Sequence, residues 1–284
     1  MIPHSAPLAC VRIVLYVACT LALMPIQALA LLTSRTLALK IPLLYHHACR
    51  RIFGVHVEVS GTPSAVHPTL FVSNHVSYLD ISVLGSLIGG SFIAKAEVAG
   101  WPVFGWLAKL QRTVFVDRQR SSTIDQGVRI RGRLTAGDNL ILFPEGTSSD
   151  GNRTLRFKSA LLGVADLEVD GAPLAVQPVS VAYSLLDGIP IGRAFRPFFA
   201  WYGDMMLASH MWRMAGLGTV TVAVHFHPPL TAVACGSRKA LAAAAQDAVA
   251  RGVAALLSGR SVRPPAPLAS ATPLPVAPLE PVTP

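Results

Sequence analysis

Residues 13–34 contain no charged side chain and are rich in Leu, Ala and Val. About 20 apolar residues are enough for a helix to cross a bilayer. We therefore expect a membrane-anchoring helix here, either spanning the bilayer or embedded in it. The alternatives are a cleaved signal peptide, suggested by the small residues of Ala28-Leu29-Ala30, and a buried core helix. Pro25 would kink the helix, which a membrane segment tolerates.

Basic residues are distributed unevenly around this apolar run. Arg12 precedes it, whereas Arg35, Lys40, Arg50 and Arg51 follow it. Loops on the cytoplasmic side of a membrane carry the excess of Lys and Arg. The rest of the chain is therefore expected on the cytoplasmic side of the inner membrane.

The composition is more apolar than that of an average soluble domain, with 52% hydrophobic and 14% charged residues. The net charge of +9 favours an anionic partner. An anionic membrane surface is expected and nucleic acid is not, because the basic residues form no stripe interleaved with aromatic residues. Cys10, Cys19, Cys49 and Cys235 lack metal-ligand or disulfide spacing. No metal site is therefore expected.

After the anchor, short apolar runs alternate with helical segments, which predicts an α/β fold with a mostly parallel central sheet flanked by helices. We divide the chain into an anchor and interfacial helix at residues 1–53, a catalytic domain at 54–260 and a Pro-rich disordered tail at 261–284. Strands are expected at 54–59, 69–72, 92–94, 113–116, 139–143, 174–182 and 220–226, and helices at 36–53, 77–89, 122–134, 158–169 and 238–257.

A histidine and an aspartate stand five positions apart directly after the strand at 69–72: His75 and Asp80. On one helix a five-residue step turns through about 500°, so the two side chains would diverge. If His75 lies in the turn and Asp80 in the first helical turn, they can pair as a general base and the carboxylate that orients it. The alternative is a buried histidine with an aspartate that stabilises a helix N-terminus.

No Gly-x-Ser-x-Gly motif occurs in the chain, which argues against an α/β-hydrolase with a serine nucleophile. The expected reaction is direct transfer of an acyl group to a hydroxyl, without an acyl-enzyme intermediate.

Four ordered blocks together resemble the glycerolipid acyltransferases of the lysophosphatidic acid acyltransferase type. The resemblance covers roughly residues 55–230 and implies the fold of that family. It also implies acyl-CoA or acyl-carrier protein as co-substrate, no further cofactor, and a lyso-lipid acceptor in the membrane. The blocks are Asn-His-x-Ser-x-x-Asp at 74–80, Val-Phe-Val-Asp-Arg at 114–118, Phe-Pro-Glu-Gly-Thr at 143–147, and Val-Gln-Pro-Val at 176–179.

The resemblance implies that Arg118 binds the anionic head group of the acceptor, since a guanidinium matches phosphate or carboxylate. Its alternative role is a salt bridge with Asp117 or Asp125. Glu145 and Gly146, followed by Thr147, would shape the acceptor pocket; alternatively this turn only supports the site.

Two further positions follow from the same resemblance. Lys95 matches a basic position near the head group, or else is a solvated lysine paired with Glu97. Pro178 is expected to shape an edge strand, because proline cannot donate to a β-ladder.

The third block departs from the family pattern at Ser148, where phosphate-using relatives carry arginine. Arg153, Arg156 or Lys158 could compensate. The variant loop is similar to the branch of lyso-ornithine lipid acyltransferases, whose acceptor bears no phosphate. The main expectation is acylation of lysophosphatidate to phosphatidate; the alternative acceptor is lyso-ornithine lipid or another lyso-lipid. A catalytically silent lipid-binding protein is a third possibility, which the intact His75 and Asp80 disfavour.

Other histidines and aromatic residues are interpreted as structural or interfacial. Adjacent side chains rarely ligate one ion, so His46, His47 and Cys49 are not expected to bind a metal. The tryptophans would form a belt at the level of the lipid head groups or pack in the core. His225 and His227 lack a carboxylate partner in the sequence and are expected in the core or at its rim.

Overall fold

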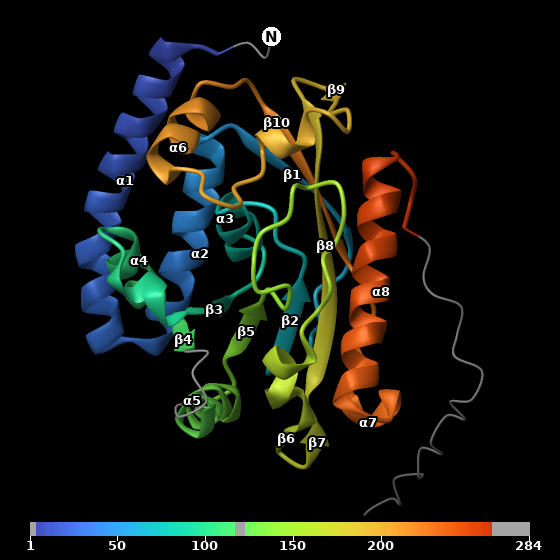
Figure 1. The fold of residues 1–284 in the computed structure, drawn as a ribbon. Helices are drawn as coiled ribbons and strands as arrows, with labels where there is room; N and C mark the ends of the chain where they lie inside the picture. The colour runs from blue at the N-terminus through green and yellow to red at the C-terminus, as the bar shows by residue number, and fades with distance from the viewer. Residues whose placement is uncertain (1–3, 117–122, 263–284) are drawn as a thin grey trace, which may run out of the picture.

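The computed structural model describes residues 4–116 and 123–262. In this part of the chain a sheet of eight strands is flanked by helices on both faces (Figure 1). The fold is α/β, as predicted. The strands are β1 (Val55–Gly61), β2 (Thr69–Ser73), β3 (Gly90–Lys95), β4 (Val114–Val116), β5 (Asn139–Leu142), β8 (Ala175–Leu186), β9 (Ile189–Pro190) and β10 (Val220–Phe226), with β6 (Glu168–Val169) and β7 (Ala172–Pro173) in a separate hairpin.

The helices include the long N-terminal pair and a C-terminal helix that packs on the sheet. They are α1 (Ala6–Thr33), α2 (Arg35–Ile52), α3 (Leu79–Gly85), α4 (Phe104–Leu110), α5 (Thr123–Thr135), α6 (Leu207–Ala215), α7 (Ala232–Cys235) and α8 (Arg238–Leu257), with 3-10 turns η1 (Ala96–Gly100), η3 (Ser159–Asp166) and η4 (Arg196–Phe198).

The sheet order is β1-β10-β8-β2-β5-β3-β4, with β9 paired to β8. Within this order only β10 and β8 pair antiparallel. The predicted mostly parallel sheet is therefore confirmed, and β1 lies at its edge. Because β2, β3, β4 and β5 are parallel, their carboxyl ends lie along the same side of the sheet.

Alternating side chains of the central strands enter two separate cores. Phe71 of β2 packs with α3 and α6 on one face. Its neighbours Leu70 and Val72 pack with α5 and α8 on the other face. A central strand that is covered on both faces is apolar throughout, which explains why residues 70–72 are continuously apolar.

Helices α1 and α2 form a hairpin beside the first of these cores (Figure 1). Both ends of α1 are tied to the body of the chain that holds the sheet. Near its start, Arg12 donates to the carbonyl oxygen of Leu217 at 2.6 Å. Near its end, Gln27 donates to the carbonyl oxygen of Leu110 at 2.8 Å.

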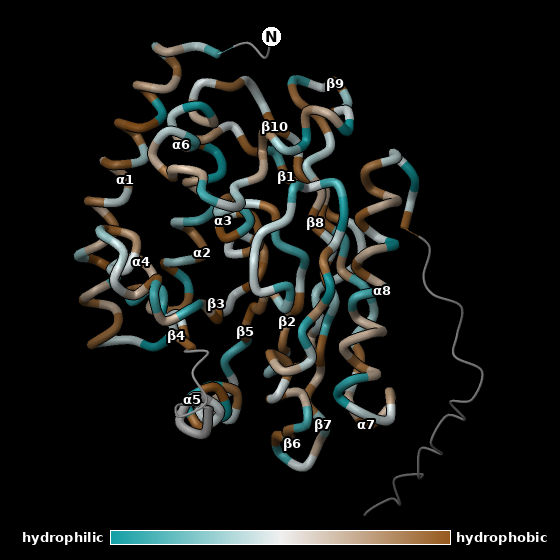
Figure 2. The backbone as a smooth tube through the Cα atoms, viewed as in Figure 1, coloured by the Kyte–Doolittle hydropathy of each residue, from teal (hydrophilic) through white to brown (hydrophobic). Residues whose placement is uncertain are grey.

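The exposed surface of α1 is strongly apolar, and Figure 2 colours much of this helix as hydrophobic. Leu21, Leu29 and Leu32 are 64%, 61% and 86% exposed. Among the described residues, α1 and α8 are long and apolar enough to cross a membrane. By contrast, α8 buries Leu241, Val249 and neighbouring residues against the sheet and is a core helix.

Two predicted elements were wrong. Residues 158–169 do not form one helix: 3-10 turns occupy Ser159–Asp166 with a kink at Leu162, and Glu168–Val169 belongs to a strand. The apolar periodicity there follows the packing of these turns under α8. The apolar helix after the turn that follows β2 ends at Gly85, before the predicted Gly89.

Pro178 lies in a central strand, not in an edge strand. It pairs with Val72 of β2, and its carbonyl oxygen accepts from the His227 amide at 3.0 Å. The proline cannot return a hydrogen bond to the His227 carbonyl. The Gln177 side chain does so instead, with Nε2 at 2.8 Å from that oxygen. This substitute donor explains how proline fits inside the sheet.

Candidate active site

The segments predicted to form the site lie together because the carboxyl ends of four parallel strands lie along the same side of the sheet. β2 leads into the turn at 74–78 and β5 leads into the Phe143 turn. β3 ends at Lys95, which lies opposite Val116 at the end of β4. Arg118, Asp117 and the Asp125 side chain lie outside the part of the chain whose side chains the structure describes.

The turn after β2 is fixed by the Asn74 side chain. This buried amide donates to the carbonyl oxygen of Val181 and accepts from its N–H, both at 2.9 Å. The next backbone groups are also bound: the His75 carbonyl accepts from Ser149, and the Val76 carbonyl accepts from Trp201. The turn therefore leaves the strand in one defined direction.

His75 and Asp80 face each other as predicted. Nδ1 of His75 lies 2.9 Å from Oδ2 of Asp80. The same oxygen accepts the backbone N–H groups of Val76 at 2.7 Å and Ser77 at 2.9 Å. Asp80 lies in the first turn of α3 and is fully buried, whereas the His75 side chain is 19% exposed.

The Asp80 carboxylate has a further partner that the sequence did not reveal. Tyr183 of β8 donates its hydroxyl to Oδ1 at 2.8 Å. Burial, with the nearby Asp80 carboxylate, raises the pKa of Tyr183, so this hydroxyl stays protonated and can donate. The only sequence signal was a tyrosine within a largely apolar strand.

Aromatic rings cover one face of the His75 imidazole. Phe143 stacks on His75 with ring centroids 4.1 Å apart and an interplanar angle of 19°. Phe92 stacks on Phe143 at 6.1 Å. These rings restrict the orientation of His75 and connect it to the apolar interior.

Glu145 is buried at 1% exposure, behind the turn that follows β5. Its Oε1 accepts the Leu155 amide at 3.0 Å. Burial raises the pKa of Glu145 to about 8; the backbone N–H groups of Leu155 and His75 oppose this rise, and the charge of Asp80 adds to it. This carboxyl group therefore links the Phe143 turn to the segment around Leu155.

The rest of this turn is more accessible. Gly146 has φ +70°, a conformation that glycine adopts without strain. Thr147 is exposed and Ser148 half-buried. Lys95 is exposed, and no ion pair to Glu97 forms within the described residues.

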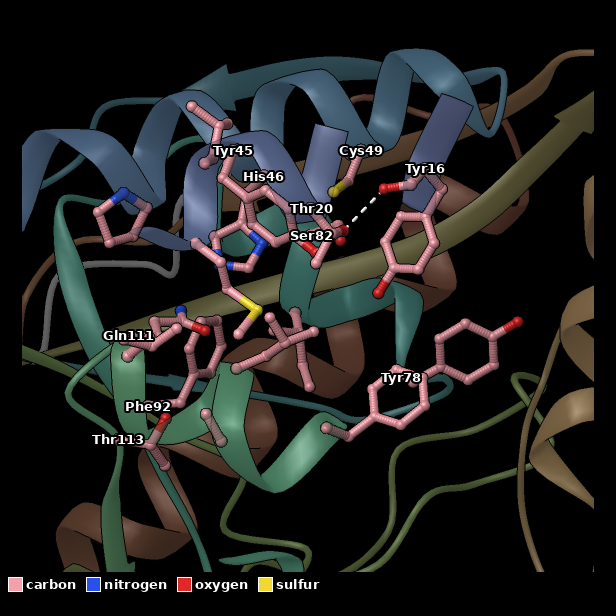
Figure 3. Close-up of a pocket in the computed structure, with 18 of the residues that line it drawn as sticks. Tyr16, Thr20, Tyr45, His46, Cys49, Tyr78, Ser82, Phe92, Gln111 and Thr113 are labelled. Atoms are coloured by element: carbon pink, nitrogen blue, oxygen red, sulfur yellow. Dashed lines mark hydrogen bonds between the residues drawn. The ribbon is translucent and has the colours of Figure 1, made fainter. Parts of the chain in front are cut away.

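A large apolar cavity begins behind the stacked rings. Its volume, including the open mouth, is about 1240 Å³. Helices α1, α2, α3, α4 and α6 form its walls with β3 (Figure 3). His75 does not line it, but Phe92 does, and so do Tyr78 and Leu79 from the start of α3.

The chain is similar in sequence to known acyltransferases. Residues 56–182 match the family model described as Acyltransferase. A lyso-ornithine lipid O-acyltransferase from Brucella abortus is 43% identical over 250 residues, covering 87% of this chain and 94% of the relative. The chain belongs to the acyltransferase family.

Two further proteins show how widely the similarity extends. The 1-acyl-sn-glycerol-3-phosphate acyltransferase from Neisseria gonorrhoeae is 35% identical over 169 residues, covering 58% of this acyltransferase and 62% of the relative. The crystal structure of the 1-acyl-sn-glycerophosphate acyltransferase PlsC from Thermotoga maritima has the same fold. Its TM-score is 0.55 at 22% identity, with coverage of 78% of this chain and 80% of that one.

Three other histidines of the acyltransferase have partners or surroundings apart from the His75–Asp80 pair. His227 bonds to Ser180 of β8 at 2.8 Å and His225 to Ser60 of β1 at 2.8 Å. His46 is buried beside the cavity. Among the tryptophans, Trp101, Trp106 and Trp212 are 38%, 65% and 38% exposed.

Proposed function

We propose that this acyltransferase moves a fatty acyl group from a thioester donor to the free hydroxyl of lyso-ornithine lipid. The observation that carries the choice of acceptor is the similarity along nearly the whole chain to a lyso-ornithine lipid O-acyltransferase. The residue after Gly146-Thr147 agrees with it: Ser148 supplies no positive charge for a phosphate. This assignment favours the alternative acceptor of the sequence analysis over lysophosphatidate.

In the proposed reaction His75 is the general base. Because Nδ1 faces the Asp80 carboxylate at 2.9 Å, the ring proton resides on Nδ1 and Nε2 carries the lone pair. Nε2 takes the proton of the acceptor hydroxyl while its oxygen attacks the thioester carbonyl. The new C–O bond forms, the C–S bond breaks, and the leaving thiolate takes the proton from the imidazolium. Asp80 stabilises the imidazolium between these steps.

The apolar cavity would hold a hydrocarbon chain during transfer. Its walls are largely apolar, and it lies next to Phe92, whose stack with Phe143 continues to His75. A fatty chain placed there would be removed from contact with water. This transfer stabilises the complex by about 0.8 kcal/mol for each buried methylene group.

Exposed cations near the strand ends could bind the acceptor head group. Lys95, Arg153 and Arg156 are exposed, and in the described part of the chain they form no ion pair. The ornithine head group carries a carboxylate that such cations attract. Arg118 keeps the role proposed from the sequence, which is to bind the acceptor head group. Glu145 keeps its proposed role in shaping the acceptor pocket.

We also propose that α1 lies in the plane of the membrane, on the side that holds the catalytic body. A helix that crossed the bilayer would separate its two ends by the full hydrocarbon thickness of about 30 Å. Both ends of α1 instead contact the body, through Arg12 and Gln27. Its exposed leucines would enter one leaflet.

Lysophosphatidate remains the second candidate acceptor, supported by the Neisseria relative and by Arg153 and Arg156 near the site. The deciding experiment compares both acceptors with one donor thioester and the full chain in membranes. Turnover of lyso-ornithine lipid, with little or none of lysophosphatidate, supports the proposal. The reverse preference would assign the chain to phosphatidate synthesis.

A further inference from the structure

The apolar cavity contains a small group of buried polar atoms without hydrogen-bond partners. Both ring nitrogens of His46 and Nε2 of Gln111 lack a partner among the described residues, and so does Oε1 of Gln27. All three residues line the cavity. His46 is only 5% exposed. Burying polar groups in this way opposes folding unless something else bonds to them.

Ring contacts on two sides hold the imidazole of His46 in place. Its ring meets Tyr45 and Phe92 edge-on, at 5.5 and 6.3 Å between centroids. On the α3 side only a glycine fits, because a Cβ on Gly85 would lie 2.4 Å from Cδ2 of His46. None of these ring contacts uses the ring nitrogens; both nitrogens are buried, and the polar side chain next to them is Gln111.

These atoms suit a ligand group that both donates and accepts hydrogen bonds. Burial lowers the pKa of His46 to about 4, with Gln111 opposing the shift, so the ring is neutral near pH 7. A neutral imidazole has one donor and one acceptor nitrogen. Gln111 adds donors and Gln27 an acceptor. A hydroxyl group, which has one donor and two acceptor positions, matches this set better than a ketone, which only accepts.

We propose that His46 and Gln111 form a subsite for a hydroxyl group on the hydrocarbon chain that enters the cavity. Figure 3 shows both side chains on the same side of the cavity as Phe92. This inference rests on the proposed acyl transfer, because the chain in the cavity is a substrate chain. The subsite adds selectivity for chains that carry oxygen, whichever acceptor head group is used.

The test compares acyl thioesters of equal length, one saturated and the others with a single hydroxyl at successive carbons. Lyso-ornithine lipid is the acceptor and the full-length enzyme is used. At one hydroxyl position kcat/KM should exceed that of the saturated chain by about tenfold, the value of one added hydrogen bond. A second arm places the hydroxyl on the acceptor chain instead, which shows which substrate the cavity holds.

The variants His46→Leu and Gln111→Leu should reverse this preference, because an apolar wall favours the saturated chain and leaves a hydroxyl unpaired. Ile41→Leu, in the same helix and cavity as His46, is the matched control and should change both rates alike. Because one variant lies in α2 and the other directly after α4, the test stays decisive if one of them folds poorly.

The outcomes separate the two proposals. Two results would overturn the subsite and leave the proposed function standing. In the first, saturated donor is turned over on lyso-ornithine lipid and neither arm shows a preference for the hydroxyl. In the second, such a preference survives both leucine variants. Failure of every donor on lyso-ornithine lipid, with turnover of lysophosphatidate, would overturn the proposed acceptor, and the same hydroxyl series on lysophosphatidate would then test the subsite.

Discussion

The hydroxyl of Tyr183 donates to Oδ1 of Asp80 at 2.8 Å, while Oδ2 of the same carboxylate faces His75 at 2.9 Å. One buried carboxylate thus joins β8 to the catalytic turn. Since Oδ2 also accepts two backbone N–H groups, Asp80 is held from four directions and presents a fixed surface to the imidazole.

Tyr183→Phe should lower kcat about 10- to 100-fold, because a hydrogen bond to a charged group contributes roughly 1.5–3 kcal/mol. The ring and its packing on Phe199 remain in this variant. A positioning role predicts a changed pH dependence of kcat/KM, measured with saturating donor. If the profile keeps its shape and only the melting temperature falls, Tyr183 is purely structural.

His75→Ala should reduce acyl transfer to background, because no other described histidine bonds to Asp80 and could take the proton of the acceptor hydroxyl. Asp80→Asn should cost somewhat less, since the ring is still stacked on Phe143 but its proton is no longer fixed on Nδ1. Lipid association and expression should stay close to wild type in both variants. Activity within a few-fold of wild type for His75→Ala would mean that the base is misassigned.

The His75–Asp80 pair was predictable because the groups that build it are local in sequence. A strand, a polar turn and a helix start within 12 positions are enough to orient both side chains. The Tyr183 contact was not predictable, because the pairing of β8 with β2 depends on the whole sheet. The same holds for Pro178, whose central position depends on Gln177 and on a strand near the C-terminus.

Burial of Glu145 also depends on long-range packing, and it has a measurable consequence. Its pKa rises from 4.5 to about 8 in the folded protein. Because the folded value is the higher one, its contribution to stability is fully present below the unfolded pKa and is lost as pH rises through about 8. The total change is on the order of a few kcal/mol.

Glu145→Gln should remove this dependence, since glutamine resembles the protonated form. Between about pH 5 and pH 9, the free energy of unfolding of wild type should fall relative to the variant. Denaturant unfolding at fixed pH values measures it. Glu97→Gln, at an exposed position, controls for the loss of one carboxylate. Parallel curves for wild type and Glu145→Gln would contradict the assigned burial effect.

The orientation of α1 can be tested with cysteines at its two ends. In a background with the four native cysteines replaced by alanine, Ser5→Cys and Thr33→Cys are introduced one at a time. Because both ends of α1 contact the catalytic body, a membrane-impermeant thiol reagent should label both positions from the cytoplasmic side, in inverted vesicles. A helix across the bilayer would expose only one of them to that side.

The insertion of the α1 leucines into the membrane can be tested by measuring vesicle binding. Leu29→Lys with Leu32→Lys should weaken vesicle binding at least tenfold, because each leucine that enters the leaflet contributes roughly 1.5–3 kcal/mol. Val233→Lys, on α7 at the opposite side of the molecule (Figure 1) and 70% exposed, is the control and should leave binding unchanged. Equal loss from both variants would show that added charge, not removal of the α1 leucines, weakens the association.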